Sequence, residues 1–236
     1  GFKKIMAKKI TDKKITLALD SSNSPLTVAI SFGKEIASIK KNGVKQEQFV
    51  FNVMDKLLGK KNNITDIKKF FFLKGPGKFT GIRIGLTIAS ILKELNKTEV
   101  SSATVFDVLY YQAKYSKDFA SFADKNKTAK IAVVLHAFRD EYFLQTFSGK
   151  TCDKPIWASE EDLKKHIKKI KNPLYFIGFA KDNGSLKDFL SSKKYGYAKK
   201  SLCVVKPETL IALAKITKFD KNTLQPLYLK PANFEK

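Results

Sequence analysis

A short, wholly apolar run followed by a glycine-rich turn constrains the fold of this chain most strongly. Phe70-Phe71-Phe72-Leu73 contains no polar residue, which is the pattern of a central strand buried on both faces. The run leads into Gly75-Pro76-Gly77-Lys78-Phe79-Thr80-Gly81 and then into a helix predicted over residues 82–95. A buried strand, a glycine turn and a helix in this order predict a sheet covered by helices, and therefore an α/β fold.

Three short strands are predicted before this unit. Alternating apolar residues indicate strands at 15–20, 26–32 and 35–40, joined by tight turns as an antiparallel meander. Apolar residues at helical spacing follow over 46–58, and Gly59 is the expected end of that helix. A strand end at 100–102 and a helix at 104–115 complete a β-β-β-α-β-α-β-α order.

The second half begins again with strands. Residues 116–128 are polar and rich in lysine, which indicates a boundary between lobes. Strands are predicted at 130–136 and 141–147, a basic helix at 160–170, a strand at 174–177, and a helix that opens with Pro207. Strands first and helices after, in both halves, predict two related α/β lobes, residues 1–116 and 117–236, rather than one doubly wound sheet.

The formal charge of +23 suggests nucleic acid as a partner, because lysines near phosphates release counterions. Nearly all the basic residues are lysine, however, and only Arg83 and Arg139 are arginine. Abundant lysine, phenylalanine, isoleucine and asparagine are typical of an AT-rich genome. We therefore interpret the charge mainly as compositional, with a weak attraction to tRNA as a by-product.

Several classes of protein are disfavoured by what the sequence contains. No apolar run approaches the roughly 18 residues needed to span a bilayer, and the basic start lacks an apolar stretch behind it, so we expect a cytoplasmic protein. Cys152 and Cys203 stand apart and are predicted to be small buried hydrophobes. His136 and His166 lie far apart in the sequence, so their spacing predicts no zinc or iron site.

The glycine-rich turn allows two interpretations. Backbone N–H groups at a helix start are a natural anion site, yet the segment is not a P-loop, since Phe79 follows Lys78. In the structural interpretation, which we favour for the loop alone, Gly77 and Gly81 let the turn close and Thr80 caps the helix.

The two helices of the first half carry more apolar surface than one face requires. A helix that is apolar nearly all round is either internal or packs its own core on one side and a partner on the other. Such a pair of helices could also dimerise as a four-helix bundle. A thick core in a monomer is the equal alternative on physical grounds. If the second stripe faces a partner, Ile88→Glu or Val53→Glu should abolish binding and leave the fold largely intact.

Four segments together resemble one known family. Leu17-Ala18-Leu19-Asp20-Ser21-Ser22, the block from Gly75 to Leu86, Ala137-Phe138-Arg139-Asp140-Glu141-Tyr142 and Pro226-Leu227-Tyr228-Leu229-Lys230 occur in the same order in the TsaB (YeaZ) family. The resemblance spans most of the chain, the glycine block is highly specific, and both arginines fall inside matching motifs.

The resemblance implies an actin-like ASKHA (ribonuclease H-like) fold and a role in making threonylcarbamoyladenosine next to the tRNA anticodon. TsaB-type proteins are non-catalytic: they bind and activate a TsaD-type enzyme, which holds the metal, and a TsaE-type ATPase completes the complex. Isolated members often form homodimers through the same surface. No cofactor or metal of this chain's own is implied. The implied docking residues are Gln46, Phe49, Val50, Val53, Met54, Leu57, Ile84, Gly85, Ile88, Ile91, Leu92 and Leu95, and the motif loop comprises Gly75, Pro76, Gly77, Phe79, Thr80, Gly81 and Arg83.

Departures from the family pattern bear on docking and on nucleotide binding. Gln46 stands at the start of the first docking helix, where the family commonly has a histidine, which weakens any role for that side chain but leaves the apolar stripe intact. The family's small-residue turn is Ile177-Gly178-Phe179-Ala180 here, and a phenylalanine would crowd a nucleotide base. Asp20 sits where actin-like kinases contact metal and phosphate, but we expect it to hold its own turn by local hydrogen bonds. An actin-like kinase or carbamoyltransferase is the enzymatic alternative, and a free-standing RNA-binding protein is the third class.

Overall fold

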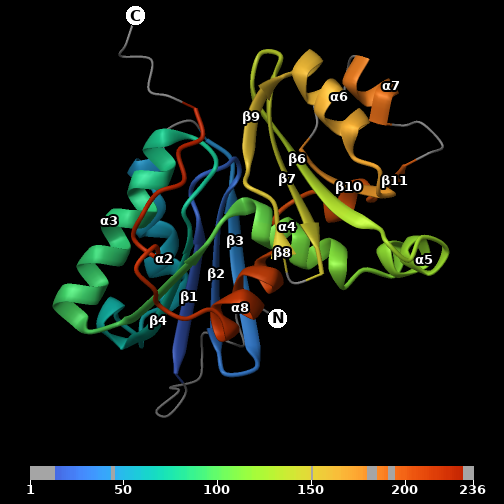
Figure 1. Ribbon diagram of the computed structural model, residues 1–236. Helices are drawn as coiled ribbons and strands as arrows, with labels where there is room; N and C mark the ends of the chain where they lie inside the picture. Colours follow the sequence, from blue (N-terminus) through green and yellow to red (C-terminus); the bar gives the residue numbers. More distant parts are fainter. Residues whose placement is uncertain (1–13, 44–45, 150, 180–184, 191–194, 231–236) are drawn as a thin grey trace, which may run out of the picture. The chain divides into compact units, whose positions relative to one another are not determined.

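The chain divides into two compact units, each built around its own sheet (Figure 1). The computed structural model describes residues 14–43, 46–149, 151–179, 185–190 and 195–230. Unit 1 comprises Gly1–Val105 and Lys206–Tyr228, and unit 2 comprises Phe106–Val205 and Leu229–Lys236. Both units are discontinuous in sequence, whereas the predicted lobes are continuous, because the segment that starts at Lys206 returns to the first sheet.

Unit 1 contains a five-stranded sheet in the order β3-β2-β1-β4-β5. Strands β1 (Ile15–Asp20), β2 (Leu26–Phe32) and β3 (Glu35–Lys41) form the predicted antiparallel meander. Strands β4 (Ile67–Leu73) and β5 (Glu99–Ala103) run parallel to β1. Parallel neighbours need a crossover, and helix α3 (Phe79–Asn96) provides it between β4 and β5.

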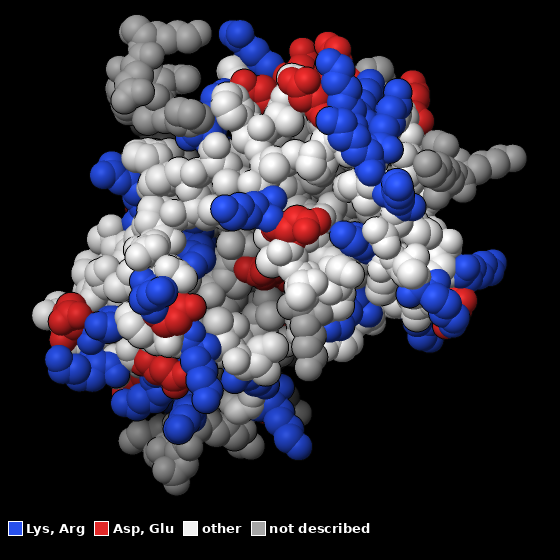
Figure 2. All heavy atoms as spheres, in the orientation of Figure 1, with Lys and Arg blue, Asp and Glu red and all other residues white. Residues whose placement is uncertain are grey.

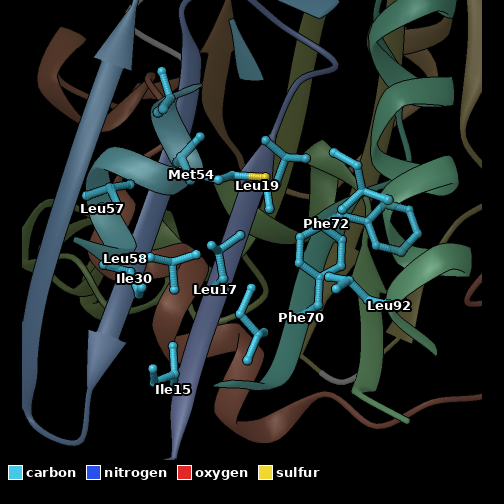
Figure 3. Close-up of a cluster of buried hydrophobic side chains, with 14 of the residues drawn as sticks. Ile15, Leu17, Leu19, Ile30, Met54, Leu57, Leu58, Phe70, Phe72 and Leu92 are labelled. Carbon is cyan, nitrogen blue, oxygen red and sulfur yellow. The ribbon is translucent and has the colours of Figure 1, made fainter. Parts of the chain in front are cut away.

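Helices cover both faces of this sheet. The predicted helix over 46–58 begins as a 3-10 turn, η1 (Gln46–Gln48), and continues as α2 (Val50–Leu58). A second 3-10 turn, η2 (Ile64–Asp66), precedes β4. Alternate side chains of β1, β2 and β4 pack with α2 and α3 in one core cluster, in which Figure 3 labels Leu17, Ile30 and Phe70. Helix α8 (Pro207–Ile216) packs against β1, β2 and β4.

Unit 2 contains a six-stranded sheet with the path β11-β10-β6-β7-β8, and β9 also pairs with β7. Strands β6 (Lys130–Phe138) and β7 (Glu141–Ser148) form an antiparallel hairpin, while β10 (Leu174–Phe179) and β11 (Gly196–Tyr197) run parallel to β6. The short strands β8 (Thr151–Cys152) and β9 (Ile156–Ser159) both pair antiparallel with β7.

Two groups of helices complete unit 2. Helices α6 (Glu160–Lys169) and α7 (Ser185–Leu190) pack with alternate residues of β6, β7 and β10 in one core cluster. Helix α4 spans Val105–Lys114, η3 spans Lys200–Leu202, and α5 spans Lys117–Lys125. Phe119 and Phe122 of α5 contact the ring of Tyr175, which alternation places on the sheet face opposite Leu174 and Phe176.

The two sheets share one plan. In each, an antiparallel hairpin (β1–β2 or β6–β7) contributes its first strand to the middle of the sheet, and two parallel strands follow beside that strand. The prediction of two related α/β lobes is therefore confirmed. Helix α5 lies within the segment that we interpreted as a polar boundary. Its start is fixed by the side chain of Ser116, whose Oγ accepts a hydrogen bond from the Phe119 N–H at 3.1 Å.

The charge of the chain is spread rather than gathered on one element. Figure 2 shows basic side chains scattered over the visible face, with acidic ones among them. Helix α6 carries both signs, since Lys164 pairs with Glu160 and Lys165 with Glu161, each at 2.7 Å. Among the residues that the structure describes, no helix is both long enough and apolar enough to cross a membrane.

Candidate docking site

The glycine-rich loop between β4 and α3 lies against the turn that follows β1. The Ser21 hydroxyl donates to the Gly81 carbonyl at 2.7 Å, and the Lys78 N–H donates to the Ser22 carbonyl at 2.7 Å. A side chain at Gly81 or Gly77 would overlap the carbonyl oxygen of Ser21 or Ser22. The glycines therefore permit a close approach of two backbones, in agreement with the structural interpretation of the loop.

Gly75 likewise permits a close approach of two backbones, here between the glycine-rich loop and the C-terminal segment of unit 1. Its φ is +108°, and an added Cβ would lie 2.7 Å from the Leu227 carbonyl oxygen. The Leu227 N–H donates to the Lys74 carbonyl at 2.8 Å. Two of the segments that resemble the family, the glycine block and the one around Leu227, are thus in contact.

Thr80 does not cap helix α3, so that prediction is wrong. The helix begins at Phe79 and its N-cap is Lys78, which makes no side-chain capping hydrogen bond. Thr80 is instead an exposed residue of the first helical turn. The glycines and the hydrogen bond from the Lys78 N–H to the Ser22 carbonyl fix the loop, so the helix does not need a capping hydroxyl.

Asp20 is buried at the end of β1, and it holds its own turn as predicted. Its Oδ1 accepts hydrogen bonds from the Ser22 N–H at 3.0 Å and from the Ser22 hydroxyl at 2.8 Å. Burial raises the pKa of Asp20 above its ordinary value, and the hydrogen bonds from Ser22 and Asn23 oppose that shift. The carboxyl group is therefore committed to local structure.

Most of the predicted docking stripe belongs to the core of unit 1. Val53 and Ile88 are only 5% and 3% exposed, and both belong to the core cluster of unit 1. Their interpretation as partner-facing side chains that tolerate glutamate is therefore wrong, because the helical stripe they occupy is the one that faces the sheet. The same core position is found for Val50, Met54, Leu57 and Leu92, and Gly85 is buried against the Phe72 ring.

A different edge of the same two helices is exposed. Phe51 of α2 is 50% exposed, and Ile91 and Leu95 of α3 are 46% and 82% exposed. Ile84 is half-buried and lies on the same side of α3 as Ile91 and Leu95, since 7 and 11 residues are close to two and three turns. Phe49 is also half-buried, against the core.

Between these helices lies a hollow of about 340 Å³, which we call the α2–α3 groove. Its lining is mostly apolar and includes one acidic and one basic side chain. The lining residues are Glu47, Val50, Phe51, Phe79, Thr80, Arg83, Ile84, Thr87 and Ile88. The groove thus brings Phe79, Thr80 and Arg83 of the motif loop together with Val50, Ile84 and Ile88 of the predicted docking set.

No family model matches the sequence. The tRNA threonylcarbamoyladenosine biosynthesis protein TsaB of Buchnera aphidicola subsp. Schizaphis graminum is 36% identical over 107 residues, which cover 44% of this chain and 51% of that protein. The chain therefore matches about half the length of this curated relative. The structure of YeaZ from Pseudomonas aeruginosa superposes with a TM-score of 0.66 at 16% identity, over 92% of this chain and 100% of that one. Both similarities support the resemblance to the TsaB (YeaZ) family that the sequence motifs indicate.

A protein with an actin-like ATPase fold from Bacteroides thetaiotaomicron is also similar, with a TM-score of 0.53 at 10% identity over 87% of this chain and 98% of that one. At such identities the likeness concerns the fold, and the predicted actin-like architecture is confirmed. Two family-based expectations concern residues outside the described part of the structure: the side chain of Gln46, and the turn at Phe179 and Ala180.

The segment of unit 2 that resembles the TsaB family, residues 137–142, contributes to a second cluster of charged and aromatic side chains. The Lys230 ammonium pairs with the Glu141 carboxylate at 2.5 Å and lies 5.2 Å and 5.5 Å from the ring centroids of Phe138 and Trp157. The Arg139 guanidinium also lies over Phe138, at 5.2 Å. Sequence reasoning found Phe138 and Arg139 through the resemblance, but it gave no signal that Trp157 joins them.

Metal-ligating and nucleophilic side chains are dispersed. Within the described ranges, no three His, Cys, Asp or Glu side chains come together in a way that could hold a metal ion. Cys203 is buried as predicted, whereas Cys152 is exposed, so the prediction of burial is wrong for that thiol. Cys152 lies on the two-residue strand β8, which no helix covers in the core cluster of unit 2.

Proposed function

We propose that this chain is a non-catalytic scaffold that binds and activates a TsaD-type enzyme in the threonylcarbamoyladenosine modification of tRNA. In this role it works in the cytoplasm, and a TsaE-type ATPase joins the larger complex. The proposal draws on the resemblance to the TsaB family and on the name of the Buchnera relative.

The observation that carries the proposal is the exposed apolar edge beside the α2–α3 groove. Phe51, Ile91 and Leu95 leave large apolar side chains in water on two adjacent elements. Burying such side chains in an interface is favourable by about 25 cal/mol per Å² of apolar surface. Phe51 lines the groove, while Ile91 and Leu95 continue the exposed side of α3 beyond it. Exposed apolar surface next to a hollow is typical of a protein–protein contact.

Asp20 supports a non-catalytic role. In an actin-like kinase the carboxylate at this position would have to face metal and phosphate. Here it is buried and accepts hydrogen bonds from the Ser22 backbone and hydroxyl. A carboxyl group with these two donors holds the β1 turn closed.

The experiment is co-elution with the cognate TsaD-type enzyme on a sizing column, together with the modification activity of the mixture. Phe51→Glu should abolish co-elution and activation, because the interface would then contain an unpaired charge. Asn52→Glu is the matched control: it adds the same charge to the next exposed position of α2, which does not line the groove. Binding by Phe51→Glu as tight as by the native chain would refute the docking site, and ATP turnover by this chain alone would favour the kinase alternative.

A further inference from the structure

Arg83 is the basic residue of the α2–α3 groove, and it is an arginine in a chain that otherwise uses lysine. Only Arg83 and Arg139 are arginine among 45 basic residues. Lysine would supply the same charge at this exposed site. What only arginine supplies is a planar group that stacks on an aromatic ring and offers paired N–H donors to a carboxylate.

The side chain of Arg83 is held in place by an aromatic stack. Its guanidinium carbon lies 4.8 Å from the ring centroid of Phe79. The Phe79 ring lies 5.0 Å from the ring of Tyr228, at an interplanar angle of 33°. Tyr228 follows Leu227, whose N–H is bonded to the Lys74 carbonyl, so the stack is anchored to the backbone of unit 1. An arginine ordered in advance loses less conformational entropy when a partner binds.

The charges near Arg83 leave it available for a carboxylate from outside. Among the described residues, no acidic side chain makes an ion pair with Arg83, although Glu47 lines the same groove. The net charge of +23 opposes the approach of a second copy of the chain and favours a partner with an acidic surface. Charge complementarity thus selects a different protein as the occupant.

We infer that Arg83 determines the specificity of the groove by pairing with a carboxylate of the enzyme partner, beside an apolar side chain that fills the hollow between Phe51 and Ile84. Phe79 and Tyr228 are positioning residues for that pair. The inference rests on the proposed function, because it names the chemistry of the partner surface that docks there.

The test is the affinity of the full chain for the cognate TsaD-type enzyme, measured by titration calorimetry at several salt concentrations. Arg83→Ala should weaken binding by about 30-fold or more, as expected when one member of a desolvated charge pair is removed. Arg83→Lys should lose most of the same affinity, because the charge is kept while the stacked, two-pronged geometry is lost. Lys56→Ala, which removes an exposed cation of α2 outside the groove, is the matched control and should bind within about twofold.

Two further variants separate pairing from simple charge. Tyr228→Leu should weaken binding by about three- to tenfold while Arg83 is intact, since the stack under the guanidinium is lost. Arg83→Glu should be rescued by one Asp→Lys or Glu→Lys substitution on the partner surface, which would identify the carboxylate.

Each outcome decides the inference. If Arg83→Lys and Arg83→Ala bind like the native chain while Phe51→Glu does not, Arg83 has no such role and the docking site stands. If none of these groove variants changes affinity, the proposed docking site itself is refuted. A native dimer in light scattering that Arg83→Ala and Glu47→Gln both dissociate would overturn the inference in favour of pairing between two copies.

Discussion

The hydroxyl of Ser21 donates a 2.7 Å hydrogen bond to the carbonyl of Gly81, sixty positions further along the chain. Both groups are buried, and the bond joins the turn after β1 to the first turn of α3. The exposed groove residues Phe79 and Thr80 belong to that same turn, and Arg83 opens the next one. The close contact of two backbones thus fixes the position from which the groove side chains project.

Gly81→Ala should be strongly destabilising, because the added methyl group would overlap the Ser21 carbonyl oxygen, which belongs to the backbone and cannot rotate away. We expect a loss of about 2–3 kcal/mol in the free energy of unfolding, at the upper end of the cost of overpacking. Urea unfolding measures this. Thr80→Ala, at the exposed neighbouring position, should stay within about 0.5 kcal/mol. Equal stabilities for the two variants would show that the two backbones are not in close contact.

Ile88 and Ile91 should respond in opposite ways to truncation. Ile88→Ala opens a cavity in the core between α3 and the sheet and should cost about 2–5 kcal/mol, whereas the half-exposed Ile91→Ala should cost less than about 1 kcal/mol. For the same reason Val53→Glu and Ile88→Glu should unfold unit 1. Thermal unfolding followed by circular dichroism compares the four variants. A folded Ile88→Glu protein would contradict the packing described above.

The strands of unit 1 and the two-lobe plan could be predicted because they depend on local patterns. Alternation located β1 and β2 to the residue, and the apolar run at Phe70 located a strand buried on both faces. The start of α3 was predicted three residues late, because Phe79 and Thr80 carry no capping signal. Helix α5 was missed, since lysines conceal the spacing of Phe119 and Phe122.

The docking surface could be predicted only to the level of the two helices. Periodicity finds the apolar stripe of a helix, but a stripe that packs on the sheet and a stripe that meets a partner have the same composition. The sequence therefore assigned Val53 and Ile88 to a partner, while Phe51, which lies outside the α2 stripe, was left out. The available signal was Phe51 itself, a single large apolar residue outside an apolar stripe that was already complete. Such a residue indicates an exposed side chain that could meet a partner.

Asp20 should make stability depend on pH. Burial is the largest influence and raises its pKa above the ordinary value of 3.8. A raised pKa means that the folded chain holds the proton more tightly than the unfolded chain. The contribution of Asp20 to the free energy of unfolding is therefore complete below about pH 3.8. It is lost as the pH rises through the pKa that Asp20 has in the folded chain.

The Asp20→Asn variant keeps an oxygen acceptor for Ser22 and cannot ionise. We expect its free energy of unfolding, relative to the native chain, to increase as the pH rises from about 3.8 and then to level off. Urea unfolding of both proteins across this range measures the difference. A difference that does not change with pH would show that Asp20 titrates equally in the folded and unfolded states.

Lys230 should stabilise unit 2 through its carboxylate and its two rings. Both it and Glu141 are partly buried, so Lys230→Ala should cost about 1 kcal/mol, more than a fully exposed ion pair. Trp157 is the single tryptophan of the chain, so its fluorescence reports on the site. We expect a changed emission for Lys230→Ala and an unchanged one for Lys127→Ala, a control that removes an exposed, weakly paired lysine. Identical spectra would mean that Lys230 does not lie over the indole.

The two cysteines should react with a thiol reagent in two separate phases. Cys152 is exposed and should react in the folded protein, while Cys203 is buried and should react only after unfolding. Partial desolvation and the nearby carboxylates of Asp107 and Asp153 raise the pKa of the Cys152 thiol, and burial raises the pKa of the Cys203 thiol. Both reactions should therefore be slow at neutral pH and should accelerate as the pH rises. Cys152→Ser should remove the first phase alone, as followed by absorbance with and without denaturant. Two thiols reacting together in the native chain would contradict the burial of Cys203 beneath Ala198, whose carbonyl lies 3.8 Å from its sulfur.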